Sequence, residues 1–249
     1  MKQTSQKVWL ENLLMIVILS GYVWMIMRLF AKNKLSYYIH PDYIWMTLAS
    51  AVVLLAVLVF VIISIGFREK KAALSSGLLK HPLRIIMIVF PLILFFAVEP
   101  KALSSQAFAS RTTGLGNELA LGKNNQAPSF VINTEKRELV DWVRLFAQNE
   151  NPEDFISLKG KVSGFVLKSG DLPDGYFTVA RYVISCCAAD ARPVGILVKY
   201  DSTKFEIKQD QWIEVRGSFE VDQIGSEHKP VLNLEEMKPI EVPDNPYIS

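Results

Sequence analysis

Two adjacent cysteines, Cys186 and Cys187, and the nearby carboxylate of Asp190 have the types and spacing best suited to chemistry, and the chain has no other cysteine. Paired thiolates are ligands for soft or borderline metal ions such as zinc. Adjacent cysteines can also close a strained, readily reduced disulfide, which would support redox chemistry. The alternative without chemistry is that strand alternation buries one thiol and exposes the other.

Imidazoles or carboxylates are needed to complete a metal site around two thiolates. The metal-ligating residues that we predict are Cys186, Cys187, Asp190, His228 and His40. His40 precedes Pro41 directly before an apolar segment, so capping that segment is its alternative role. The sequence contains no hydrolase motif, phosphate-binding loop or dinucleotide fingerprint, and we therefore expect no enzymatic activity.

The cysteines lie at a corner between two strand-like runs of a soluble domain predicted at residues 130–249. Five such runs alternate or are apolar, with glycine at the bends: Leu158–Leu167, Tyr176–Cys186, Val194–Tyr200, Gln211–Val221 and Val231–Ile240. A helix predicted at Thr134–Phe146, capped by Thr134, precedes them and presents an apolar stripe to the sheet. We therefore expect an all-β domain, a small five-stranded OB-like barrel with one flanking helix. A β-sandwich is the alternative.

Residues 1–100 are predicted to be a membrane α-helical region, with helices at about 9–30, 43–67 and 83–99. The 25 residues of Tyr43–Phe67 carry no charge and, as a helix, exceed the roughly 30 Å hydrocarbon core of a bilayer. The first helix is predicted to be a retained anchor, with a cleaved signal peptide as the alternative. The third segment has only 14 uncharged residues, Ile85–Val98, so a re-entrant or interfacial helix is its alternative.

Charge separates the two halves of the chain. Residues 1–128 hold 13 Lys and Arg against 5 Asp and Glu, whereas residues 129–249 hold 14 against 20. If all three apolar segments cross the bilayer, seven basic residues lie on one side and five on the other. This bias predicts a cytoplasmic N-terminus and an extracytoplasmic C-terminal domain. If the third segment does not cross, the domain lies in the cytoplasm instead. Residues 101–129, rich in Ser, Ala, Gly, Asn and Gln, are predicted to be a linker.

Nucleic acid is not an expected partner. OB folds often bind oligonucleotides, but a domain with a net charge of −6 repels phosphate. Binding to single strands depends on a positive groove lined by aromatic side chains, which this composition does not provide.

Three stretches resemble a known group of membrane proteins: YIHPDY at Tyr38–Tyr43, the proline-containing segment that ends near Glu99, and YVISCCAADARPVGILV. Together with QWIEVRGSFE and the closing IEVPDNPYIS, they are similar to the YcgQ-like family of uncharacterised membrane proteins. The resemblance implies transmembrane helices, a C-terminal OB-like domain, and pairing with a predicted multi-span permease. It also implies a link to metal-ion homeostasis, with zinc as the suggested metal. Cys186, Cys187 and Asp190 occupy its signature corner.

These observations lead to two functional expectations. The first is a non-enzymatic, membrane-anchored accessory subunit of a permease in the cell membrane, whose extracytoplasmic domain captures or delivers a small solute or metal ion. Its expected partners are a multi-span permease and the lipid bilayer. The second is a stand-alone, membrane-tethered thiol redox or metal-binding factor.

Overall fold

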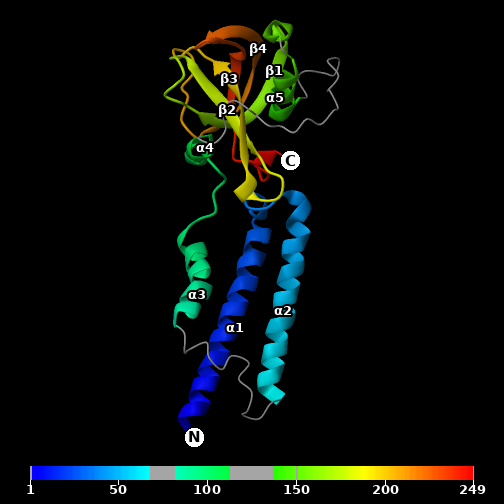
Figure 1. Cartoon of the computed structure of the whole chain (residues 1–249), viewed down its shortest axis with the longest axis vertical. Helices are drawn as coiled ribbons and strands as arrows, with labels where there is room; N and C mark the ends of the chain where they lie inside the picture. Colours follow the sequence, from blue (N-terminus) through cyan, green and yellow to red (C-terminus); the bar gives the residue numbers. More distant parts are fainter. Residues whose placement is uncertain (1, 68–81, 113–136, 150, 249) are drawn as a thin grey trace. The chain divides into compact units, whose positions relative to one another are not determined.

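The structure is a computed structural model of the 249-residue chain, and it describes residues 2–67, 82–112, 137–149 and 151–248. The chain divides into two compact units, Met1–Lys101 and Ala102–Ser249. Helices make up the described part of the first unit, and a sheet with flanking helices makes up that of the second (Figure 1).

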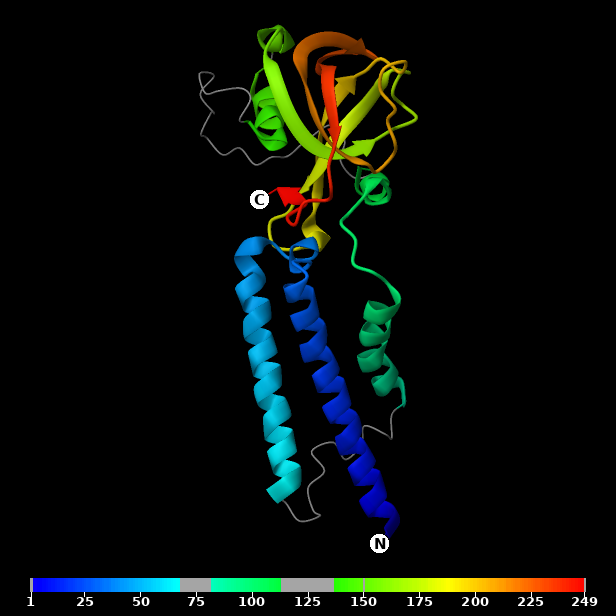
Figure 2. The ribbon, with the colours of Figure 1, turned by 180° about the vertical axis from the view of Figure 1, so that it is seen from behind.

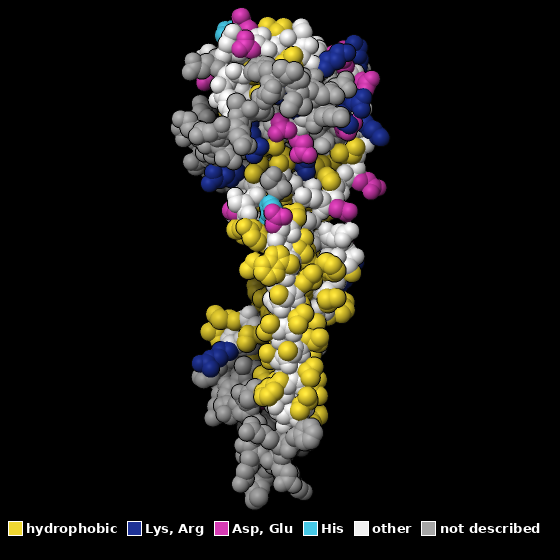
Figure 3. Space-filling view, turned by 90° about the vertical axis from the view of Figure 1, so that its right-hand side faces the viewer, with side chains coloured by type: hydrophobic (Ala, Val, Ile, Leu, Met, Phe, Trp, Pro, Cys, Tyr) yellow, Lys and Arg dark blue, Asp and Glu magenta, His cyan; other side chains and the backbone are white. Residues whose placement is uncertain are grey.

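The helical unit contains α1 (Lys2–Ala31), α2 (Ile44–Phe67) and α3 (Pro82–Ala97), with two short 3-10 turns, η1 (Leu35–Tyr37) and η2 (Pro41–Tyr43), between α1 and α2. Two stretches are long and apolar enough to span a membrane, Trp9–Ala31 and Pro41–Ile65. α3 has 16 residues and is thus only about 24 Å long, shorter than a typical span. Hydrophobic side chains cover the exposed helix faces (Figure 3).

α3 packs on α1 through small and aromatic side chains. Gly21 of α1 lies against Leu92, where an added Cβ would come within 3.2 Å of a leucine methyl group. Trp24 stacks on Phe96 with ring centroids 5.3 Å apart. The Tyr22 hydroxyl donates a 2.7 Å hydrogen bond to the carbonyl of Ile88, three residues before the proline inside α3. This bond links α3 to α1 within one turn of Pro91.

The second unit contains a six-stranded sheet whose strands are β1 (Lys159–Leu167), β2 (Tyr176–Val183), β3 (Arg192–Lys199), β4 (Trp212–Ile224), β5 (Glu227–Pro239) and β6 (Tyr247–Ile248). The strand order is β1-β4-β5-β3-β2-β6, and β1 also pairs with β2. Neighbouring strands are antiparallel except for β3–β5 and β2–β6, which are parallel. Figure 2 shows the strongly curved strands from behind.

The main core lies between the inner face of the sheet and α5 (Leu139–Gln148). Trp142 of α5 is fully buried against Phe219 of β4, with ring centroids 4.5 Å apart. A second, smaller core gathers around Phe165, Tyr182 and Trp212. α4 (Ser105–Thr112) and the residues before it pack there, since Leu103, Ala107 and Phe108 contact this cluster.

Several predicted helices and strands are present but begin or end at other residues than predicted. The five predicted strands are present, but the sheet has a sixth, β6, which is too short for sequence patterns to reveal. The expected linker 101–129 contains α4, because tertiary contacts with the second core stabilise this short polar helix. The helix predicted at Thr134 begins at Leu139, with Glu138 and Asp141 forming a reciprocal capping box. Residues 113–136, which include the predicted cap Thr134, lie outside the described residues.

Candidate functional site

The cysteines lie in the loop between β2 and β3, whose two ends are buried. Ile184 and Ala191 are 2% and 5% exposed and belong to the second core. The N–H of Ile184 also donates to the carbonyl of Ile248 in β6, which fixes the start of the loop. With both ends held, the residues between them project into solvent. Cys186 is exposed and Cys187 is half-buried.

The two thiols lie close together but are not joined by a disulfide. The Sγ atoms of Cys186 and Cys187 are 3.7 Å apart. Cys187 has an extended backbone and begins a single 3-10 turn, Ala188–Asp190, whose last N–H donates to the Cys187 carbonyl. This turn brings the carboxylate of Asp190 back to the thiol end of the loop.

Asp190 holds the loop in shape through its carboxylate. Its Oδ1 accepts a hydrogen bond from the N–H of Ser185 at 3.2 Å, and its Oδ2 accepts one from the N–H of Cys186 at 2.8 Å. Desolvation opposes ionisation, but these bonds, led by that of Cys186, hold the pKa of Asp190 below its ordinary value. The same carboxylate, followed by Cys187, raises the pKa of the Cys186 thiol from 9.0 to about 11.

This environment reduces the reactivity of Cys186 at neutral pH. The thiolate is the nucleophile in disulfide exchange, and catalytic cysteines usually have a lowered pKa. A thiol with a pKa of about 11 is almost fully protonated at pH 7. A cation bound at the sulfurs would instead displace the proton and would be attracted by the neighbouring carboxylate. Both redox exchange and metal binding at Cys186 therefore require removal of a proton that the neighbouring carboxylate helps to retain.

Within the second unit, the structure does not bring His228 to the thiols. His228 lies on β5 opposite Gln223 of the β4–β5 hairpin. β5 meets β3 only at the Val198–Leu232 and Lys199–Asn233 pairs, so no ladder connects this hairpin end to the β2–β3 loop. In the described part of the chain, no three His, Cys, Asp or Glu side chains gather closely enough to hold a metal ion.

His40 belongs to the helical unit and caps a turn. Its Nδ1 accepts a 3.1 Å hydrogen bond from the N–H of Asp42, at the start of the 3-10 turn Pro41–Tyr43. The capping alternative for His40 is thus confirmed. His81, the other histidine that precedes a proline, lies outside the described residues.

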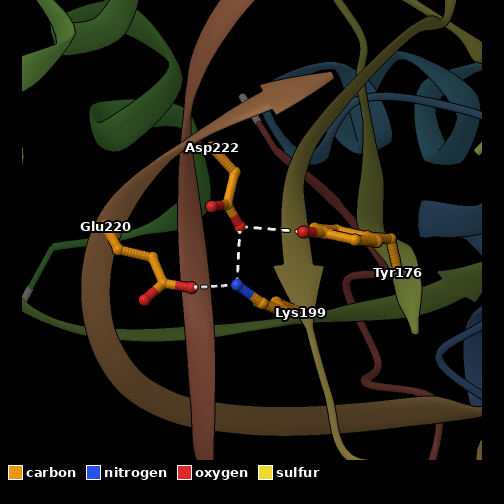
Figure 4. Close-up of polar contacts among 4 residues, drawn as sticks. All are labelled: Tyr176, Lys199, Glu220 and Asp222. Atoms are coloured by element: carbon orange, nitrogen blue, oxygen red, sulfur yellow. Dashed lines mark hydrogen bonds and ion pairs between the residues drawn. The ribbon is translucent and has the colours of Figure 1, made fainter. Parts of the chain in front are cut away.

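A polar cluster that the sequence did not suggest joins β2, β3 and β4 (Figure 4). Lys199 Nζ lies 2.9 Å from both Glu220 Oε1 and Asp222 Oδ2. The Tyr176 hydroxyl donates to the same oxygen of Asp222 at 2.8 Å. Tyr176 pairs with Lys199 across β2–β3, and Glu220 and Asp222 alternate on β4, so only the strand register reveals the cluster.

The charges of this cluster compensate one another. The ammonium of Lys199 holds the pKa of Asp222 below its ordinary value, against a smaller opposing effect of desolvation. In turn, Glu220 and Asp222 raise the pKa of Lys199. Burial, and then the bond to Asp222, raise the pKa of Tyr176. The ammonium of Lys199 thus contacts both carboxylates, and the cluster connects three strands.

Comparison with known proteins places nearly the whole chain in one family. The DUF1980 N-terminal domain matches residues 14–113, and the DUF1980 C-terminal domain matches residues 115–249. No curated protein matches the sequence. The narrower resemblance to YcgQ-like proteins, with their permease partner, stays a prediction. The two matched domains together cover nearly the full length of the chain, which therefore belongs to the uncharacterised DUF1980 family.

Proposed function

We propose that this protein is a non-enzymatic, membrane-anchored accessory subunit of a permease, and that the β2–β3 loop of its extracytoplasmic domain captures or delivers a thiophilic metal ion, zinc being the foremost candidate. The observation that carries the proposal is the exposed thiol pair of Cys186 and Cys187, with sulfurs 3.7 Å apart.

The separation of the sulfurs matches the spacing of two ligands on one ion. Two thiolates bound to a tetrahedral zinc ion at about 2.3 Å have sulfurs about 3.8 Å apart. Cys186 and Cys187 therefore need little rearrangement to bind as a pair. The ion would gain further attraction from the carboxylate of Asp190, which is held at the same loop.

An incomplete ligand set supports capture and delivery over permanent storage. Structural zinc sites have four protein ligands, whereas a site with open positions exchanges ligands with solvent or a second molecule. In the described residues no third ligating side chain joins the two thiols. An ion held by two thiolates could therefore pass to a receiver that offers more ligands.

The remaining parts of the proposal concern placement and fold. Two stretches, Trp9–Ala31 of α1 and Pro41–Ile65 of η2 and α2, are long and apolar enough to anchor the chain in a bilayer. Few side chains in these stretches are buried, and many are exposed hydrophobic groups that lipid would cover. An extracytoplasmic domain also requires α3 to cross the bilayer, because two spans would return the chain to the side of its N-terminus. We further infer that the pairings β1–β4, β4–β5, β5–β3, β3–β2 and β2–β1 form a ring of the OB type, as the Greek-key order suggests.

Metal content of the purified protein tests the site. The full-length protein, extracted in mild detergent, is loaded with one equivalent of zinc, desalted and measured by elemental mass spectrometry. We expect close to one zinc per wild-type chain and almost none in the Cys186→Ser, Cys187→Ser double variant. Ser185→Ala, an exposed neighbour that leaves both thiols intact, is the matched control. Equal zinc in the double variant and the wild type would remove the metal proposal.

Association with a permease is tested separately. A tagged copy of the chain is expected to co-purify with a multi-span membrane protein from mild detergent, and mass spectrometry identifies the partner. Recovery of the chain alone from its native membrane, with zinc still bound, would favour the stand-alone metal-binding factor.

A further inference from the structure

Arg28, in the last turn of α1, has an unusual environment for a cation. Its guanidinium carbon lies 5.1 Å from the centroid of the Trp24 ring and 5.9 Å from that of Phe95 in α3. The side chain is exposed, and the two rings hold it against the helix pair α1–α3. Aromatic faces orient a guanidinium while leaving its N–H donors available.

Among the described residues, no carboxylate lies within ion-pair distance of Arg28 or of Lys32, and both are exposed. The backbone N–H of Lys32 donates to the carbonyl of Arg28, so the helical turn continues and the two side chains lie one turn apart. Two adjacent cations therefore face outward from one end of α1.

The surface next to these cations is apolar. Trp24 is 47% exposed and Phe96 is 62% exposed, and they form a stacked pair beside the guanidinium. Met27 and Phe30 of the same two turns are also exposed. An anion bound here would have its charge at Arg28 and Lys32 and hydrocarbon against the rings.

We propose that Arg28 and Lys32 bind the phosphate of an anionic phospholipid, whose acyl chain packs on Trp24 and Phe96. This inference rests on the proposed insertion of α1 in a bilayer. The apolar stretch Trp9–Ala31 ends three residues after Arg28, which matches the depth of a headgroup. A guanidinium fork binds two phosphate oxygens at once, and the exposed rings favour a lipid over a free anion.

Native mass spectrometry of the full-length protein in mild detergent tests the site, with dioleoyl phosphatidylglycerol and dioleoyl phosphatidylcholine as probes. We expect the wild type to bind phosphatidylglycerol about tenfold more tightly than phosphatidylcholine. Arg28→Gln should remove most of this preference, and Lys32→Gln should reduce it about threefold. Arg84→Gln, which removes an exposed arginine near the start of α3, is the matched control and should retain it.

Equal affinity of the wild type for the two lipids would overturn the proposal, as would a preference unchanged in both Arg28→Gln and Lys32→Gln. Displacement of phosphatidylglycerol by millimolar inorganic phosphate would show that the site takes a free anion and would likewise overturn it. Membrane insertion is measured independently by resistance to alkaline carbonate extraction. A protein that resists extraction but shows no lipid preference refutes only the lipid site.

Discussion

Removing the carboxylate of Asp190 should make Cys186 much easier to ionise. Asp190 is the largest cause of the rise in the pKa of this thiol from 9.0 to about 11, and Cys187 is the next. In the Cys187→Ser background, where Cys186 is the sole thiol, Asp190→Asn should lower that pKa by at most about two units. The thiolate fraction at pH 7 would then rise by up to about 100-fold.

The rate of reaction will rise less than the thiolate fraction. A thiolate of lower pKa is a weaker nucleophile, with a Brønsted coefficient of about 0.4–0.5, which offsets nearly half of the gain on a logarithmic scale. We therefore expect exchange with an aromatic disulfide reagent to be about tenfold faster at pH 7 in the Asp190→Asn variant. The assay follows the released chromophore from pH 6 to pH 11, so that midpoint and rate are measured together.

Asp174→Asn in the same Cys187→Ser background is the matched control, because it removes a carboxylate from the preceding loop and should leave the Cys186 midpoint unchanged. If the titration midpoint of Cys186 is the same in the Asp190→Asn and control proteins to within a few tenths of a pH unit, the electrostatic account of this loop is refuted. The position of Asp190 would then serve only to shape the turn.

Three further predictions concern stability, measured by urea unfolding of the full-length protein. Gly217→Ala should destabilise the sheet by about 2–3 kcal/mol, because its Cβ would meet a backbone carbonyl of β5. Asp222→Asn should lower the free energy of unfolding by about 1 kcal/mol or less at pH 7. Because Lys199 depresses the folded pKa of Asp222, this cost is present above the unfolded pKa, about 3.9, and disappears as the pH falls through the folded value. Tyr182→Phe should cost about 1 kcal/mol, because its hydroxyl donates a 2.7 Å hydrogen bond to the backbone ahead of α4.

Each of these three stability predictions has a control variant or an outcome that would contradict it. Gly170→Ala has open space around the new Cβ and should be neutral or stabilising by up to about 1 kcal/mol. A similar loss in both glycine variants would contradict the close-approach explanation. A pH-independent effect of Asp222→Asn would show that its ion pair contributes nothing. Unchanged protease sensitivity at α4 in Tyr182→Phe would mean that its other contacts, including the hydrogen bonds of Ser105 to Asp210, are enough to hold this helix.

Local sequence patterns were enough to predict the strands and apolar helices. Alternation in runs such as Tyr176–Cys186 marks the strands because one face of the sheet is buried. α4 and β6 were missed for a physical reason. SQAFASRT has no sustained apolar period, and Tyr247 and Ile248 form only a two-residue strand, so both depend on contacts made after the rest of the domain has folded.

The candidate site was predictable only where neighbours in sequence are also neighbours in space. Cys186, Cys187 and Asp190 belong to one loop, and they stay together in the structure. His228 was proposed from residue type alone, and the strand register places it on another hairpin. The Tyr176–Lys199–Asp222 contacts escaped prediction because they require the pairing of strands that composition cannot supply.

The parallel contact between β3 and β5 has a kinetic consequence. The antiparallel neighbours β2–β3 and β4–β5 can form early as local hairpins, in about 1–10 μs. Joining them through β3–β5 and β1–β4 requires distant segments to meet and carries the loop-closure entropy. Refolding is therefore expected over milliseconds to seconds, and a chain halted at the hairpin stage would present bare strand edges to its neighbours.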